Sequence, residues 1–144
     1  MTATTDNLAS ILADTYTLAL KTQNHHWNVE GAHFVSLHAL FEEQYTELHA
    51  AADTVAERMR ALGATAPGGL QAYGALTRIA DAKDQMGERD RVADFAADNE
   101  AVAKTLVEAT AAASQAGDEA TADLLIARTQ AHQKAAWMLR AVLG

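Results

Sequence analysis

The stretch that decides the fold is residues 26–57, which read HWNVEGAHFVSLHALFEEQYTELHAAADTVAE. Apart from its ionisable residues, this stretch reads as an ordinary amphipathic helix. Five of its side chains can bind a metal ion: His26, His38, Glu42, Asp53 and Glu57. Imidazole and carboxylate groups suit a borderline-to-hard transition metal such as Fe(II), and the chain has no cysteine that would make the site softer. The first hypothesis is therefore an iron site.

The residues before this stretch predict a helix that ends near its first histidine. Apolar, small or weakly polar residues recur at steps of three and four, as on one face of a helix: Leu8, Leu12, Thr15, Ala19, Thr22 and His26. Asp6 is the expected N-cap of this helix, and Gly31 interrupts the pattern. His26 is therefore expected at the C-terminal end of an inward-facing stripe.

The residues after Gly31 predict three more long helices. The expected segments are a helix over 34–62, a loop over 64–69, a short helix within 70–84, a helix over 88–115 and a helix that starts after Asp118. Gly63 fits the C′ position of the first of these helices, and Gly117-Asp118 separates the last two. Four long helices with one long crossover predict an all-α, ferritin-like four-helix bundle in a single domain over residues 1–144.

Composition and charge agree with this class and restrict the partners. A chain of 144 residues with one proline, rich in alanine and leucine, favours one all-α domain. Its net charge of −8 repels polyphosphate and attracts cations. The absence of cysteine excludes a disulfide framework and a thiolate site. The N-terminus does not resemble a signal peptide, and no apolar run reaches the ~18 residues that a membrane span requires. We therefore expect a soluble, cytoplasmic protein without membrane contact.

The spacing of the candidate ligands excludes a complete metal site within one chain. At ~100° per residue, Glu42, Asp53 and Glu57 lie ~40°, ~60° and ~100° around the helix from His38, so all four share one face. Asp53 lies fifteen positions after His38, which corresponds to ~22 Å along the helix axis. Metal–ligand bonds span only ~2.0–2.2 Å. One copy of this helix therefore cannot close the site.

A second copy of the chain can supply the missing ligands. The alternative within a ferritin bundle is a Glu-x-x-His motif on other helices, but the one such string, Glu30 to His33, straddles the predicted turn. Two chains paired antiparallel about a two-fold axis would form two identical sites at their interface. Each site would combine His26, His38 and Glu42 of one chain with Asp53 and Glu57 of the other.

A longer pattern surrounds these ligands. It consists of KTQNHHWNVEG at residues 21–31, followed by Phe34, Leu37-His38, Phe41-Glu42 and Asp53-x-x-x-Glu57-Arg58. This pattern resembles the Dps family of miniferritins (DNA-binding proteins from starved cells), and the resemblance covers nearly the whole chain. It implies a hollow dodecamer with ferroxidase centres at two-fold interfaces, Fe(II) oxidation preferably by hydrogen peroxide, and storage of an Fe(III) mineral. All five ligand positions match, with Glu42 where some members have Asp.

Several residues also have simpler interpretations. Taken alone, His26 would be a hydrogen-bonded core histidine, and Glu42 and Glu57 would be solvated surface charges. Trp27 suits the core of an interface, and the resemblance implies that it lies beside the iron and can take up an oxidising equivalent. Packing roles are expected for Tyr45, His132 and Trp137, and surface or supporting roles for His25, His33 and His49. Of the last three, only His49 is placed to orient a ligand.

The resemblance departs from DNA-condensing Dps proteins at the termini. Such members usually bind DNA through a Lys/Arg-rich extension that neutralises phosphates. Here no Lys or Arg precedes Lys21, and the chain ends at Gly144 without a basic tail, so DNA binding is not expected. Two alternatives to a ferroxidase remain: a structural protein that compacts DNA, and a non-catalytic iron or zinc store.

Acidic residues are concentrated where the fourth long helix begins. Asp118 and Glu119 suit the positive end of the helix dipole, whereas Asp123 lies beyond the first turn, where this effect has faded. In the resembled family, acidic residues of this segment line negatively charged pores on three-fold axes. Asp118 and Asp123 are therefore candidate pore residues for Fe(II).

Overall fold

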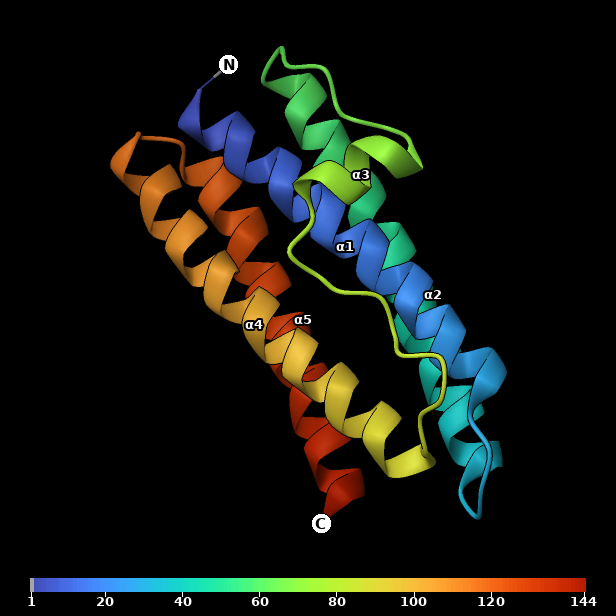
Figure 1. Ribbon diagram of the computed structural model, residues 1–144. Helices are drawn as coiled ribbons and strands as arrows, with labels where there is room; N and C mark the ends of the chain where they lie inside the picture. Colours follow the sequence, from blue (N-terminus) through green and yellow to red (C-terminus); the bar gives the residue numbers. More distant parts are fainter. Residues whose placement is uncertain (1) are drawn as a thin grey trace.

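The computed structural model describes residues 2–144, and all regular secondary structure in this range is helical (Figure 1). The five helices are α1 (Ala3–Asn28), α2 (Phe34–Ala61), α3 (Leu70–Leu76), α4 (Glu88–Gln115) and α5 (Glu119–Leu143). The four long helices form two hairpins, α1 with α2 and α4 with α5, and the hairpins pack against each other mainly through α1 and α4. The prediction of a ferritin-like four-helix bundle is confirmed. No helix among the described residues is long and apolar enough to cross a membrane.

The predicted starts of α2, α4 and α5 are correct, whereas α1 begins earlier than predicted. Thr2, not Asp6, is the N-cap: Thr5 N donates to Thr2 Oγ1 (3.2 Å), and Thr2 N donates to Thr5 Oγ1 (2.9 Å). This capping box satisfies two backbone donors reciprocally, so the helix begins before Asp6. Gly63 has φ +84° and follows the C-cap of α2, as predicted. Asp118 caps α5 by accepting from Thr121 N at 3.0 Å.

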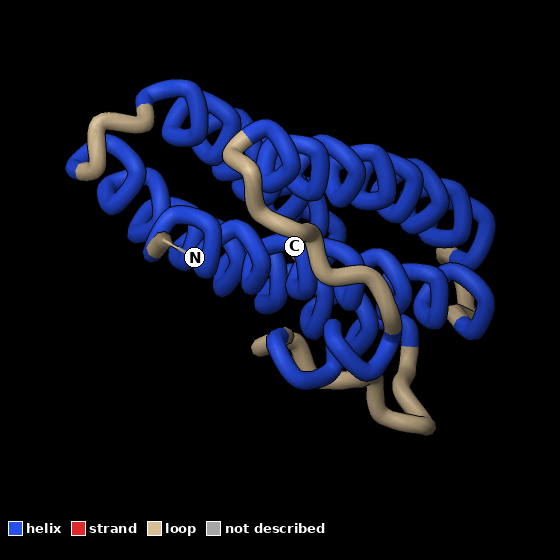
Figure 2. Tube along the Cα trace, turned by 90° about the horizontal axis from the view of Figure 1, so that it is seen from above, coloured by secondary structure: helices blue, strands red, loops and turns tan. Residues whose placement is uncertain are grey.

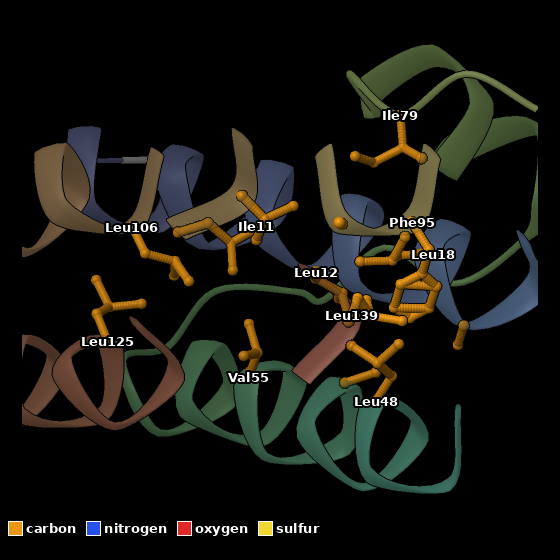
Figure 3. Packing of buried hydrophobic residues seen from close by; sticks show 14 of the residues in the cluster. Ile11, Leu12, Leu18, Leu48, Val55, Ile79, Phe95, Leu106, Leu125 and Leu139 are labelled. Carbon is orange, nitrogen blue, oxygen red and sulfur yellow. The ribbon is translucent and has the colours of Figure 1, made fainter. Parts of the chain in front are cut away.

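The core is formed by the apolar stripes of the four long helices (Figure 3). Every member of the predicted α1 stripe is buried. Phe41 of α2 and Phe95 of α4 stack with ring centroids 6.0 Å apart, which joins the two hairpins at mid-bundle. Full burial of one large apolar side chain contributes ~1.5–3 kcal/mol, so these stripes supply the main drive for folding.

The crossover between the hairpins contains one short helix, as predicted. Helix α3 ends at Leu76, and the chain then continues without helix to α4 (Figure 2). The physical reason is Asp14, a buried residue of α1. Its carboxylate accepts from Thr77 Oγ1 (2.9 Å), Arg78 N (2.7 Å) and Arg78 Nη2 (2.6 Å), which holds this segment extended along α1.

His132 is a core residue, as predicted. Its Nδ1 donates to Asn99 Oδ1 (2.9 Å), and its Nε2 accepts from Arg128 Nη2 (3.2 Å). Burial, followed by the charge of Arg128, lowers the pKa of His132 from 6.5 to about 3. The folded protein therefore keeps this imidazole neutral at pH values at which the unfolded chain protonates it.

This difference predicts a loss of stability in mild acid. The pKa of His132 is lower in the folded than in the unfolded protein. The contribution of His132 to the free energy of unfolding is therefore complete above pH ~6.5 and is lost as pH falls. Between pH 7 and pH 5 this one group should lower the free energy of unfolding by about 2 kcal/mol. His132→Gln, which retains a donor and an acceptor, should show a correspondingly smaller loss. Denaturant titrations at both pH values and at fixed protein concentration measure the difference, and equal losses in both proteins would contradict the assignment.

Candidate metal centre

The two histidines of the predicted site meet across the turn between α1 and α2. The rings of His26 and His38 stack with centroids 3.8 Å apart and planes 12° apart. His26 Nδ1 lies 2.7 Å from the carbonyl oxygen of His38, and His38 Nδ1 lies 2.7 Å from the carbonyl oxygen of His26. A carbonyl oxygen can only accept, so both Nδ1 atoms carry the proton and donate. In the neutral ring, this tautomer leaves the lone pair of each Nε2 for a metal ion.

Aromatic side chains support this pair of rings. Phe34 stacks on His38 with a centroid distance of 5.0 Å, and Tyr45 presents its ring to His26 in an edge geometry at 5.3 Å. His26 is buried, and His38 is partly buried. The neighbouring Trp27 is 67% exposed in the single chain. The rings are thus held in a defined orientation at the edge of the bundle.

The predicted carboxylate ligands do not join the histidines within one chain. Glu42, Asp53 and Glu57 are all exposed and lie along the length of α2. Across residues 2–144, no cluster of three or more His, Cys, Asp or Glu side chains could hold a metal ion. Arg60 donates to the carbonyl of Ala64 and is not hydrogen-bonded to Asp53, which lies two turns earlier on α2. The single chain therefore presents a histidine pair and a separate row of solvated carboxylates.

The interior of the bundle does not offer a substitute site. A cavity of about 220 Å³ lies between α2, α4 and α5, and its polar lining includes Asn99, His132 and two exposed glutamates, Glu43 and Glu47. Ferritin-like sites at this location use inward-facing Glu and Glu-x-x-His groups. Here the Nε2 lone pair of His132 is already used by Arg128, whose positive charge also disfavours a cation. A metal site inside this four-helix bundle is therefore not supported.

One buried polar network was not predicted. His25 is completely buried, which excludes a surface role and leaves the supporting one: Nδ1 accepts from Arg91 Nη1 (3.0 Å), and Nε2 faces Asp94 Oδ2 (3.3 Å). Burial, followed by the charge of Arg91, lowers the pKa of His25 to about 4. Trp137, for which a packing role is expected, is 65% exposed in the single chain. The partners of His25, Arg91 and Asp94, lie 66 and 69 positions away, so no local sequence pattern indicated its burial.

The other histidines differ in their surroundings. His33 is exposed and hydrogen-bonded to Glu88, in agreement with a surface or supporting role. His49 contacts the rings of Tyr16 (5.7 Å) and Tyr45 (6.1 Å) in edge geometry. Its role in orienting Asp53 stays a prediction.

The two candidate pore residues also differ. Asp118 accepts from Thr121 N and from Arg58 Nη2, both at 3.0 Å. The hydrogen bonds from Thr121, followed by the charge of Arg58, keep the pKa of Asp118 below its usual value. Asp123 is exposed one turn further along α5. In the single chain, Asp118 thus has a capping role, and Asp123 is open to solvent.

Comparisons with known proteins agree with this architecture. The model of the ferritin-like domain matches residues 5–144. The DNA protection during starvation protein of Brevibacillus brevis is 36% identical over 132 residues, which cover 92% of this chain and 89% of that protein. The crystal structure of Dps from Staphylococcus aureus matches with a TM-score of 0.96 and 29% identity over 98% of this chain and 95% of that one.

A third comparison bears on the metal. The crystal structure of the DPS protein from Vibrio cholerae O1, described as a member of a broad superfamily of ferritin-like diiron-carboxylate proteins, matches with a TM-score of 0.93 and 28% identity. The match covers 98% of this chain and 89% of that one. The helical arrangement, the extent of these matches and the identity to curated relatives lead to one conclusion: this chain belongs to the Dps family of ferritin-like proteins.

Proposed function

We propose that this protein is a ferroxidase and iron-storage miniferritin that oxidises Fe(II), preferably with hydrogen peroxide, and stores the Fe(III) mineral in a hollow shell. The observation that carries this proposal is the His26–His38 pair, whose reciprocal hydrogen bonds leave both Nε2 atoms free. Neutral imidazole nitrogens with a fixed tautomer are suitable ligands for Fe(II). Membership of the Dps family supports iron as the metal.

The proposed site requires a second copy of the chain. Glu42 lies one turn from His38, whereas Asp53 and Glu57 lie further along α2. An antiparallel pair of chains would bring the carboxylates of one copy to the histidines of the other, and an isologous interface forms two such sites. Trp27, the residue after His26, is exposed in the single chain and would become covered in this pair. We infer that six such pairs form the dodecamer that the family resemblance implies.

The proposed reaction assigns a role to each group. His26, His38, Glu42, Asp53 and Glu57 bind Fe(II) as the substrate, and the three carboxylates offset its positive charge. Two Fe(II) ions held in one site can deliver both electrons that reduce hydrogen peroxide to water, with uptake of two protons. Delivering the electrons as a pair avoids free hydroxyl radical, the product of one-electron reduction. Trp27 would take up an oxidising equivalent when only one Fe(II) is present.

The stoichiometry of the reaction tests this function. Stopped-flow mixing should show two Fe(II) oxidised per hydrogen peroxide, with little hydroxyl radical by spin trapping. His38→Ala should slow the reaction by more than ~10-fold, because even loss of a ligand's outer hydrogen-bond partner commonly costs ~10–100-fold. Glu108→Gln, which changes an exposed carboxylate on α4, should retain the wild-type rate. Unsuppressed radical formation, or a normal rate in His38→Ala, would count against a ferroxidase.

Mixed assemblies test the shared site. His38→Ala and Asp53→Ala proteins should each be inactive, because each lacks one ligand in both sites of a pair. After random mixing, a heterodimer has one site with all its ligands, so about a quarter of the wild-type activity should return. Native mass spectrometry verifies the mixing. Verified heterodimers without activity would exclude the shared interface.

The alternative functions predict different measurements. A structural DNA-compacting protein requires clustered, accessible positive charge, and Lys21, which is buried between Asp94 and Asp98 at 2.9 and 2.8 Å, does not contribute to it. Together with the net charge of −8, this argues against duplex binding, and no gel shift is expected at low salt. A non-catalytic iron or zinc store would bind the metal without consuming peroxide.

We also propose that Asp118 and Asp123 line a pore through which Fe(II) enters the shell. Asp123→Asn should slow Fe(II) uptake at subsaturating concentration without changing the size of the shell, because it removes negative charge from the proposed channel. Asp118→Asn should slow uptake and also lower the melting temperature, because Asp118 caps α5. Uptake assays with size-exclusion chromatography separate these effects. Wild-type uptake by an intact Asp123→Asn shell would remove Asp123 from the path.

A further inference from the structure

One face of α4 carries a stripe of charged residues that the proposed reaction does not use. Its members are Glu88, Arg91, Asp94 and Asp98, which recur at steps of three and four from the first residue of the helix. Figure 1 shows that this end of α4 lies beside the turn between α1 and α2. The stripe therefore faces the segment that carries both candidate histidine ligands.

Glu88 holds the turn itself. One carboxylate oxygen accepts from the backbone N of His33 at 3.0 Å, and the other lies 2.5 Å from His33 Nδ1. Gly31 makes this approach possible: it has φ +131°, and a Cβ atom there would lie only 2.4 Å from Glu88 Oε2. His33 is the N-cap residue of α2, and Phe34, the next residue, stacks on His38. Glu88 therefore fixes the start of the helix that carries His38.

The next residues of the stripe hold the end of α1. Arg91 Nη1 donates to Asn24 Oδ1 (3.1 Å) and to His25 Nδ1 (3.0 Å). Asp94 faces both His25 Nε2 (3.3 Å) and Lys21 Nζ (2.9 Å). His25 is completely buried and directly precedes His26. The last turn of α1, which carries His26, is thus attached to α4 by buried polar contacts.

We propose that this α4 stripe positions the His26–His38 pair, with Glu88, Arg91 and Asp94 as positioning residues that do not touch the metal. The reciprocal Nδ1–carbonyl bonds require α1 and α2 to keep one relative position, and each helix is anchored to α4 within a few residues of its histidine. That the pair binds metal rests on the proposed function. The positioning itself concerns only the metal-free protein.

Glu88 offers the cleanest test because it lies at the edge of the bundle. Glu88→Ala removes both acceptors for His33, whereas Glu88→Gln keeps a carbonyl oxygen for the backbone N–H. Glu100→Ala is the matched control: Glu100 is another α4 glutamate with two contacts, to Arg140 Nε (2.8 Å) and Nη2 (3.0 Å). Two quantities are measured in the assembled protein. The first is hydrogen exchange of the His26 and His38 Nδ1–H groups in metal-free, 15N-histidine-labelled protein. The second is the affinity for Co(II), a probe that is not oxidised in the assay.

The expected pattern separates positioning from general stability. Glu88→Ala should accelerate Nδ1–H exchange and weaken Co(II) binding by ~10–100-fold, the usual cost of losing a ligand's supporting contacts. Glu88→Gln should restore most of the slow Nδ1–H exchange and most of the Co(II) affinity. Glu100→Ala should match wild type in both quantities. Wild-type Co(II) affinity in Glu88→Ala, or an equal loss in Glu100→Ala, would overturn the proposal. A wild-type protein that binds no Co(II) would refute the proposed metal site. In that case the Nδ1–H exchange rates alone would test the positioning role, and unchanged exchange in Glu88→Ala would overturn it.

Discussion

The paired hydrogen bonds between His26 and His38 are the constraint on which the site depends. Each ring donates to the backbone carbonyl of the other residue, so the position of two helices and the tautomer of two imidazoles are fixed together. The carbonyl of His26 lies in the last turn of α1, where helix carbonyls lack intrahelical partners. The bond therefore also satisfies a helix end. A short turn through Gly31, with φ +131°, brings the two helices close enough for this contact.

The distribution of charge disfavours a metal site inside the bundle. Its interior is packed mainly with apolar side chains, and buried polar groups such as Asp14 and His132 are hydrogen-bonded to neighbouring side chains and backbone. A cluster of unpaired carboxylates in that interior would carry a large desolvation cost. In the proposed pair of chains, the carboxylates along α2 remain in water until the partner chain covers them. An interface site thus avoids placing this cost on the folding of the single chain.

Polar contacts between distant segments determine how the apolar hairpins are joined. Asp14 holds the crossover against α1, Lys21 joins α1 to α4, and Glu88 holds the turn of the first hairpin. Apolar packing is non-directional and tolerates small shifts between helices. Hydrogen bonds with defined geometry restrict those shifts. Apolar burial therefore supplies most of the stability of the bundle. The polar contacts determine where its loops and helix ends lie.

The sequence by itself determined the features that depend on neighbouring residues. Periodic apolar positions and turn residues located α2 and α4 almost to the residue, and the spacing of His38 and Asp53 on one helix showed that one chain cannot close the site. Only the tertiary structure decided the burial of His25, the end of α3 and the orientation of the histidine rings. These features depend on contacts with Arg91, with Asp14 and between His26 and His38. Such partners lie twelve to sixty-six positions apart, beyond the range of local periodicity.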